Sequence, residues 1–121
     1  MSAATTESYS NKFLGTEVDV KIDRPLGSTH PKHGFRYQVN YGFIPETKAP
    51  DGEELDVYVL GVEHPLESFK GTCIAVIHRT NDDDDKLIVV PAGTTLTDEE
   101  IRTATHFQEQ YFVSEIIRND R

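Results

Sequence analysis

Residue types that mark particular classes of protein are scarce in this sequence. Its 121 residues include one cysteine, one methionine and no tryptophan. A single cysteine cannot form an internal disulfide or a zinc-binding cysteine cluster, so disulfide-rich and zinc-finger folds are excluded. Cys73 lies in the apolar run 72–77 and is expected to be a buried small hydrophobic residue, in keeping with a reducing, intracellular setting. No apolar run approaches the roughly 20 residues that cross a bilayer as a helix.

Positive charge is also scarce. Lysine and arginine total 12, against 21 aspartates and glutamates, which gives a net charge of −9. Such an acidic chain lacks the basic surface that binds nucleic acid, and anionic membranes repel it. We therefore expect neither a nucleic-acid nor a membrane partner. The acidic excess fits two situations, plain solubility or a site where carboxylates surround a cation.

The pattern of apolar residues predicts a mainly β fold. Residues 1–12 are rich in serine and threonine and are expected to form a flexible tail, with residues 13–121 as a single domain. Apolar and polar residues alternate over 17–22, which predicts a half-buried strand, and more continuous apolar runs predict strands at 57–62, 72–78 and 87–90. Turn-rich loops separate these strands without a strand–helix rhythm. This favours an antiparallel or mixed β barrel with one or two helices at its C-terminal end.

One helix has a clear start. Thr97 and Glu100 have the spacing of a capping box, in which each side chain bonds the backbone of the other residue. The apolar residues that follow recur at helical spacing: Ile101, Ala104, Phe107 and Tyr111. The segment 112–117 either continues this helix or forms a last strand.

An acidic segment lies where a turn enters a predicted strand. In an extended chain Asp51 and Glu53 point to the same side, and a bend at Gly52 would bring Asp56 towards them. Carboxylates packed this closely repel one another unless a cation neutralises them, and such hard oxygen ligands suit Mg²⁺, Mn²⁺ or Ca²⁺. The alternative is an acidic turn exposed to solvent.

A second acidic run, 82–85, ends at Lys86. A run of like charges is typical of a solvated hairpin tip. Lys86, however, adjoins the predicted strand 87–90, so its position is well defined. A lysine placed beside carboxylates can hold one oxygen of a phosphate whose other oxygens bind a metal.

Positive charge gathers in one loop, 21–36, where Asp23 is the one carboxylate. Its basic side chains are Lys21, Arg24, His30, Lys32, His33 and Arg36. This local excess in an acidic chain indicates an anion site, although a mobile surface loop is an equal alternative. Tyrosines can donate hydrogen bonds to phosphate oxygens, and a role in the core is the alternative for each. The candidates are Tyr37, Tyr41 and Tyr111.

Four motifs, in order along the chain, resemble those of the family I inorganic pyrophosphatases. The first two are Tyr-Gln-Val-Asn-Tyr-Gly-Phe-Ile at 37–44 and Asp-Gly-Glu-Glu-Leu-Asp-Val at 51–57. The third is Asp-Asp-Lys-Leu at 84–87 followed by Val-Pro at 90–91. The fourth is His106-Phe107 with Tyr111. The sequence is thus similar to that family, as a short and divergent member.

This resemblance implies an OB-like β barrel with flanking helices. It also implies hydrolysis of pyrophosphate to phosphate with Mg²⁺, or with Mn²⁺ in its place, by a cytoplasmic homo-oligomer. The implied metal ligands are Asp51, Glu53, Asp56 and Asp84, with Glu53 helping to activate the attacking water. Lys86, Tyr41 and Tyr111 are implied to bind phosphate oxygens, with Lys86 and Tyr41 also catalytic and Tyr37 lining the site.

The chain departs from the family pattern at several positions. Glu53 stands in place of an aspartate, Glu54 in place of a proline, and Phe112 in place of a phosphate-binding lysine. The family's charged residues before the first tyrosine have no clear match. The basic loop stands there instead, and its Arg24, His30 and Lys32 are predicted to bind phosphate. These departures leave two alternatives: a relative that hydrolyses or binds another phosphorylated small molecule, or an acidic protein without a ligand.

Overall fold

The computed structural model describes residues 9–47, 53–80 and 84–119. It begins with a 3-10 helix, η1 (Tyr9–Phe13), and contains six strands and one α-helix. The strands are β1 (Glu17–Arg24), β2 (Asn40–Ile44), β3 (Leu55–Val59), β4 (Ser68–Arg79), β5 (Asp85–Val90) and β6 (Ser114–Arg118), and the helix is α2 (Asp98–Glu109). Neither helix in these ranges is long and apolar enough to cross a membrane.

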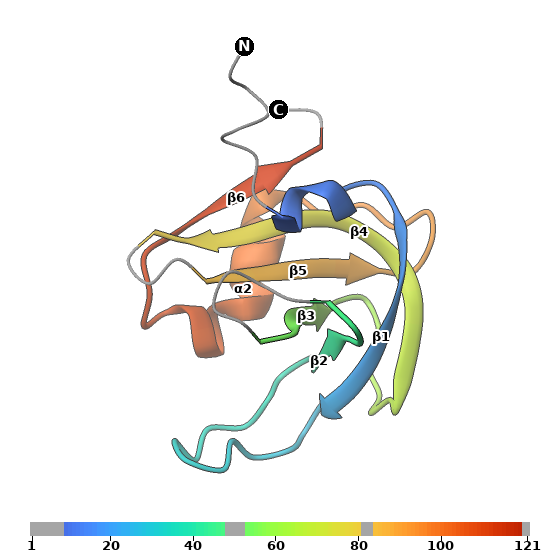
Figure 1. Ribbon diagram of the computed structural model, residues 1–121. Coiled ribbons are helices and arrows are strands. Elements are labelled where there is room, and N and C mark those ends of the chain that lie inside the picture. The colour runs from blue at the N-terminus through green and yellow to red at the C-terminus, as the bar shows by residue number, and fades with distance from the viewer. Residues whose placement is uncertain (1–8, 48–52, 81–83, 120–121) are drawn as a thin grey trace.

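The strands form a closed barrel, which confirms the predicted mainly β fold. They follow the order β1-β2-β3-β5-β4-β6, and an additional pairing of β1 with β4 closes the ring. The β3–β5 pair is parallel and the other pairs are antiparallel, so the barrel is mixed. Strand β6 pairs with β4 alone and extends the sheet outside the ring. Figure 1 shows the curved β1 and β4 strands enclosing β2 and β3, with α2 behind β5.

The alternation of side chains in the parallel strands divides the core into two clusters. Val57 in β3 and Leu87 in β5 belong to the cluster inside the barrel, together with Val18, Val20, Ile22, Ile44, Leu55, Val59, Cys73, Val76 and Val89. Tyr58 and Ile88, one residue further on, belong to the second cluster, with Ile101 and Phe107 of α2. Since successive strand residues point to opposite faces, Asp56 and Lys86 share the outer face with this second cluster.

The predicted helix is confirmed at its start. Thr97 is the N-cap, and both bonds of the capping box with Glu100 are present. The undecided segment 112–117 is a strand over 114–118, because Ile116 and Ile117 pair with β4 there. Within the described residues, the barrel is therefore flanked by a single α-helix, α2, in the C-terminal part of the chain.

Two expectations about exposed segments differ from the structure. Residues 9–12, predicted to be tail, belong to η1, where Ser10 is fully buried. Its hydroxyl donates a hydrogen bond of 2.7 Å to Asp85 Oδ2, and His78 Nδ1 lies 2.7 Å from Asp85 Oδ1. Asp85 is 2% exposed and begins β5, so the end of the acidic run is part of the core and not a solvated tip. Residues 1–8 and the aspartates at 82 and 83 lie outside the described residues.

Candidate active site

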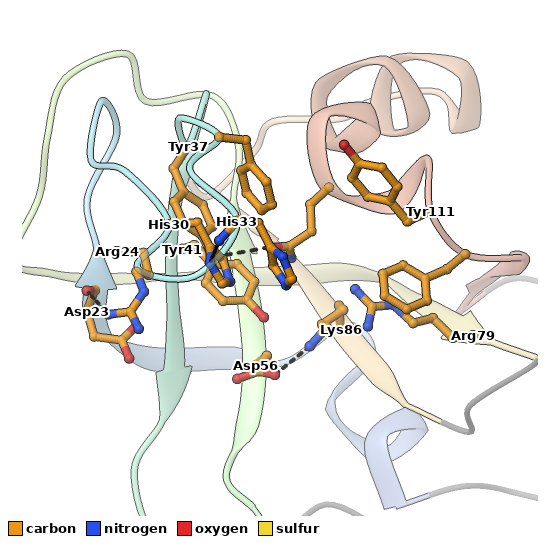
Figure 2. Close-up of a pocket in the computed structure, with 13 residues that line it drawn as sticks. Asp23, Arg24, His30, His33, Tyr37, Tyr41, Asp56, Arg79, Lys86 and Tyr111 are labelled. Atoms are coloured by element: carbon orange, nitrogen blue, oxygen red, sulfur yellow. Dashed lines mark hydrogen bonds and ion pairs between the residues drawn. The ribbon is translucent and has the colours of Figure 1, made fainter.

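A cavity of about 760 Å³ opens on the outer face of the barrel beside the C-terminal end of α2. In the view of Figure 2, Arg24 and Asp23 lie on one side of it, Arg79 on the other, and Asp56 and Lys86 between them. The cavity combines cations, carboxylates and aromatic rings. Its lining residues are Asp23, Arg24, His30, His33, Phe35, Tyr37, Tyr41, Asp56, Arg79, Lys86, Gln108, Tyr111 and Phe112.

Lys86 is held between two carboxylates. The parallel register of β3 and β5 sets Asp56 opposite Lys86. The Lys86 Nζ lies 2.5 Å from Asp56 Oδ2 and 3.0 Å from Asp84 Oδ2. The lysine side chain is 5% exposed, whereas that of Asp56 is 34% exposed. A buried ammonium needs compensating charge, and the two aspartates supply it and fix the side chain in position.

Two tyrosines of the cavity remain protonated hydrogen-bond donors. Burial raises the pKa of Tyr41 well above its ordinary value, and the negative charge of the neighbouring Asp56 adds to this effect. Burial also raises the pKa of Tyr37, whose hydroxyl donates a hydrogen bond of 3.2 Å to Gln108 Oε1. The two rings stack with centroids 5.3 Å apart. A neutral phenol can donate a hydrogen bond to an anion without charge repulsion.

A buried ion pair joins the cavity wall to α2. The Nε and Nη2 atoms of Arg79 in β4 donate to the two carboxylate oxygens of Glu109 at 3.1 and 2.6 Å. The same carboxylate accepts a hydrogen bond of 2.7 Å from the hydroxyl of Tyr58, which in turn accepts one of 2.6 Å from Gln108 Nε2. Burial opposes the charge on Arg79, but the hydrogen bonds and charge of Glu109 outweigh it and raise the pKa of the guanidinium.

The basic loop folds over one side of the cavity. A β-bridge between Thr29 and Arg36 closes it, and the ring centroids of His30 and His33 lie 4.6 Å apart. His30 Nδ1 accepts hydrogen bonds from the backbone N–H groups of Lys32 and His33 at 3.0 and 3.1 Å. The proton of the neutral ring is therefore on Nε2.

This geometry predicts how His30 titrates. Desolvation lowers its pKa below the ordinary value, and the positive charges of His33, Arg24 and Lys32 lower it further. The neutral ring therefore supports the loop at a pH above the ordinary histidine pKa, and this support is lost as the pH falls through the lowered pKa. NMR titration should give His30 a lower midpoint in the protein than in a peptide of residues 25–37. A midpoint equal to or above that of the peptide would contradict the bonding at Nδ1.

A strand bulge brings a second carboxylate to the cavity. The β1–β2 register shifts between Ile22 and Arg24, and Asp23 occupies the bulge. A bulge redirects side chains at the end of a strand. Partial removal from water raises the pKa of Asp23, and the charge of Asp56 contributes in the same direction. Asp23 and Asp56 thus both line the cavity, and carboxylate oxygens are the ligands that a hard cation such as Mg²⁺ prefers.

The structure brings together some of the predicted metal ligands. Asp56 lines the cavity, and Asp84 meets it at Lys86. Glu53 is exposed ahead of β3 and is not among the lining residues, and Asp51 lies outside the described residues. Within the described part of the chain, no three histidine, cysteine or acidic side chains are grouped to hold a metal. The four-residue metal site therefore stays a prediction.

The predicted phosphate-binding residues are distributed unevenly. Arg24, His30, Tyr37, Tyr41, Tyr111 and Lys86 line the cavity. Tyr111 is 65% exposed and so lies at the rim. Lys32 is exposed in the turn after His30 and is not among the lining residues. Its backbone N–H, not its ammonium, has a contact with the loop histidine.

Several lining residues were not singled out from the sequence. Asp23 is the lone carboxylate of the basic loop, and the neighbouring sequence carries no signal for the bulge that turns it towards the cavity. Arg79 ends an apolar strand, where a charged residue is usually exposed. Gln108 lies seven residues after Ile101, two helical turns along the same face, so its helical position was a usable signal.

Comparison with known proteins gives the same fold. An inorganic pyrophosphatase from Helicobacter pylori is similar with a TM-score of 0.65 and 19% identity, over 86% of this chain and 85% of the other. One from Ehrlichia chaffeensis has a TM-score of 0.64 and 23% identity, over 82% and 83%. At such identities the similarity shows the fold alone.

Sequence relatives show the family. The inorganic pyrophosphatase of Saccharolobus solfataricus is 38% identical over 80 residues, 63% of this chain and 44% of that protein. That of Rickettsia prowazekii is 30% identical over 104 residues, 68% of this chain and 60% of the other. The chain thus spans less than half the length of the first of these relatives. The model of the inorganic pyrophosphatase family matches residues 8–118. Since this match covers nearly the whole sequence, the chain belongs to the inorganic pyrophosphatase family.

Proposed function

We propose that this protein hydrolyses inorganic pyrophosphate to phosphate with the help of Mg²⁺. The observation that carries the proposal is the position of Lys86. Its buried ammonium is fixed between Asp56 and Asp84 in the wall of the cavity. Tyrosine side chains and the basic loop line the rest of that cavity. Phosphoryl transfer depends mainly on positioning and on charge stabilisation, and these groups supply both.

The carboxylates are suited to a hard divalent cation. Asp56 and Asp84 are the predicted ligands that meet at Lys86, and Glu53 and Asp51 complete the predicted set. When bound, Mg²⁺ would lower the pKa of a coordinated water and neutralise phosphate charge. Mn²⁺ prefers the same oxygen ligands and is a proposed substitute.

The remaining residues bind and orient the anion. Lys86 holds an oxygen of the phosphoryl group, and Tyr41 donates a hydrogen bond beside it. Arg24 and His30 contact the anion from the opposite side of the cavity, and Tyr111 contacts it from the rim. Since these groups lie on several elements that the barrel fixes in place, little reorganisation accompanies the reaction.

Phosphate release from pyrophosphate tests this proposal. The purified protein should release phosphate with millimolar Mg²⁺, lose that activity in excess EDTA, and regain it when Mg²⁺ is restored. No release with Mg²⁺ or Mn²⁺ would overturn the proposal, provided that circular dichroism shows a folded β protein. The cytoplasmic location and the homo-oligomer that the resemblance implies stay predictions, and sedimentation velocity would measure the second.

A further inference from the structure

Arg79 is a second buried cation in the wall of the cavity, on the side of Lys86. Its residue is 5% exposed, and it lines the cavity together with Phe112 and Tyr111. In Figure 2 its guanidinium points towards the end of the Lys86 side chain. Neither the four motifs nor the basic loop includes this residue.

Among the described residues, contacts with Glu109, Asp84 and Phe112 fix the guanidinium in place. The Glu109 carboxylate accepts hydrogen bonds from Nε and Nη2, as described above. Nη1 lies 3.4 Å from Asp84 Oδ2, the oxygen that also contacts Lys86 Nζ. The ring of Phe112 lies under the guanidinium, with 3.5 Å between its centroid and the Arg79 Cζ. A planar cation held by a carboxylate on one side and a ring on one face is oriented before any ligand arrives.

The link through Asp84 ties the two cations together. Asp84 Oδ2 lies 3.0 Å from Nζ of Lys86 and 3.4 Å from Nη1 of Arg79. Two cations that converge on one carboxylate oxygen can also converge on one phosphoryl oxygen, which has the same charge and hydrogen-bonding geometry. The Arg79 contact is the longer of the two and is the one that an anion would replace at lower cost.

We propose that Arg79 binds phosphate oxygens beside Lys86, as the cation that stands in for the lysine absent at position 112. This inference rests on the proposed function, because it assigns a further residue to the same site. The contact between Phe112 and Arg79 places both positions at one point of the cavity wall. A cation carried at either position therefore serves the same region, and the ring at 112 supports the cation at 79.

Binding of imidodiphosphate, which is not hydrolysed, tests the proposal by calorimetry in Mg²⁺. Arg79→Gln should raise the dissociation constant about 10- to 100-fold, the range for loss of a charge-assisted hydrogen bond. Arg79→Lys, which keeps the charge but not the planar fork, should recover part of that loss. Arg102→Gln is the matched control, since Arg102 lies on the exposed part of α2 and contacts Ser114. It should leave the dissociation constant within about twofold.

A relocated cation separates ligand binding from a structural role. If Arg79 binds the anion, the double variant Arg79→Met with Phe112→Lys should bind imidodiphosphate at least tenfold more tightly than Arg79→Met alone. If Arg79 only ties β4 to α2, affinity stays at the wild-type value in every folded variant while thermal stability falls, and this result would overturn the proposal. If Arg79→Gln does not fold, Phe112→Leu is the replacement test, because it keeps the charges of Arg79 and Lys86. It should still weaken binding severalfold, since the ring no longer supports the guanidinium.

Failure of this inference is distinct from failure of the proposed function. A wild-type protein that binds imidodiphosphate but releases no phosphate from pyrophosphate would end the hydrolase proposal and leave the Arg79 comparison intact. A wild-type protein that hydrolyses pyrophosphate, with unchanged affinity in Arg79→Gln, would end the Arg79 proposal alone.

Discussion

Replacing Asp56 with asparagine is expected to lower kcat/KM for pyrophosphate by about 10²- to 10³-fold, the usual cost of losing one preorganised charge at a reacting centre. The substitution preserves the size of the side chain and removes its charge. Lys86 thereby loses its charged partner at 2.5 Å, and the predicted metal site loses the ligand that lines the cavity. Phosphate release at several Mg²⁺ concentrations measures the effect.

Asp19→Asn is the matched control for this prediction. Asp19 is also a strand aspartate with a lysine partner, but its side chain is 79% exposed and lies 3.8 Å from Lys70 Nζ. Exposed ion pairs of this kind contribute little, so activity and stability should both stay close to the wild-type values. Equal activity of Asp56→Asn and Asp19→Asn would remove Asp56 from the site. Because Asp84 remains beside Lys86, Asp56→Asn should still fold.

Replacing Glu109 with alanine is expected to lower the free energy of unfolding by about 3–5 kcal/mol, the cost of leaving a buried charge without its partner. Glu109 accepts two hydrogen bonds from Arg79 and one from Tyr58, and all three residues are buried. Without the carboxylate, Arg79 keeps the long contact with Asp84 and the ring of Phe112. Urea denaturation followed by circular dichroism measures the change.

Two comparison variants show whether the loss comes from depriving Arg79 of its glutamate partner. Glu99→Ala alters an exposed glutamate of the same helix and should change the unfolding free energy by no more than about 0.5 kcal/mol. The double variant Arg79→Met with Glu109→Leu removes both charges and should be more stable than Glu109→Ala alone. If the double variant is the less stable of the two, the ion pair itself supplies the stability, and the loss does not come from an arginine deprived of its glutamate.

The strands and the helix start could be predicted because their signals are local. Alternation over 17–22 and the capping box at Thr97 depend on residues a few positions apart, and both are present in the structure. The segment 112–117 stayed undecided, because its apolar residues suit a helix or a strand equally well. Pairing with β4, about 40 residues earlier in the chain, decides for a strand. The residues of this segment do not indicate which strand they pair with.

The same limit applies to the candidate site. Lys86 could be placed beside carboxylates from the sequence because Asp84 is two residues away and the strand follows at once. Arg79 and Glu109 could not be placed in the site from the sequence, since a charged residue at a strand end or on a helix is usually exposed. The charge of each is compensated in the core by the other, 30 positions along the chain. The burial of Asp85 likewise depends on Ser10, at a distance of 75 positions.

The parallel pairing of β3 with β5 also determines when the site comes into existence. Asp56 and Lys86 belong to strands that are adjacent in space but separated in the chain by the whole of β4. Parallel contacts of such long sequence separation form late in folding, since the loop entropy must be lost first. A nascent chain that has left the ribosome as far as β4 therefore carries Asp56 without its ammonium partner. The pair of charges at the proposed site is therefore complete only when the barrel closes.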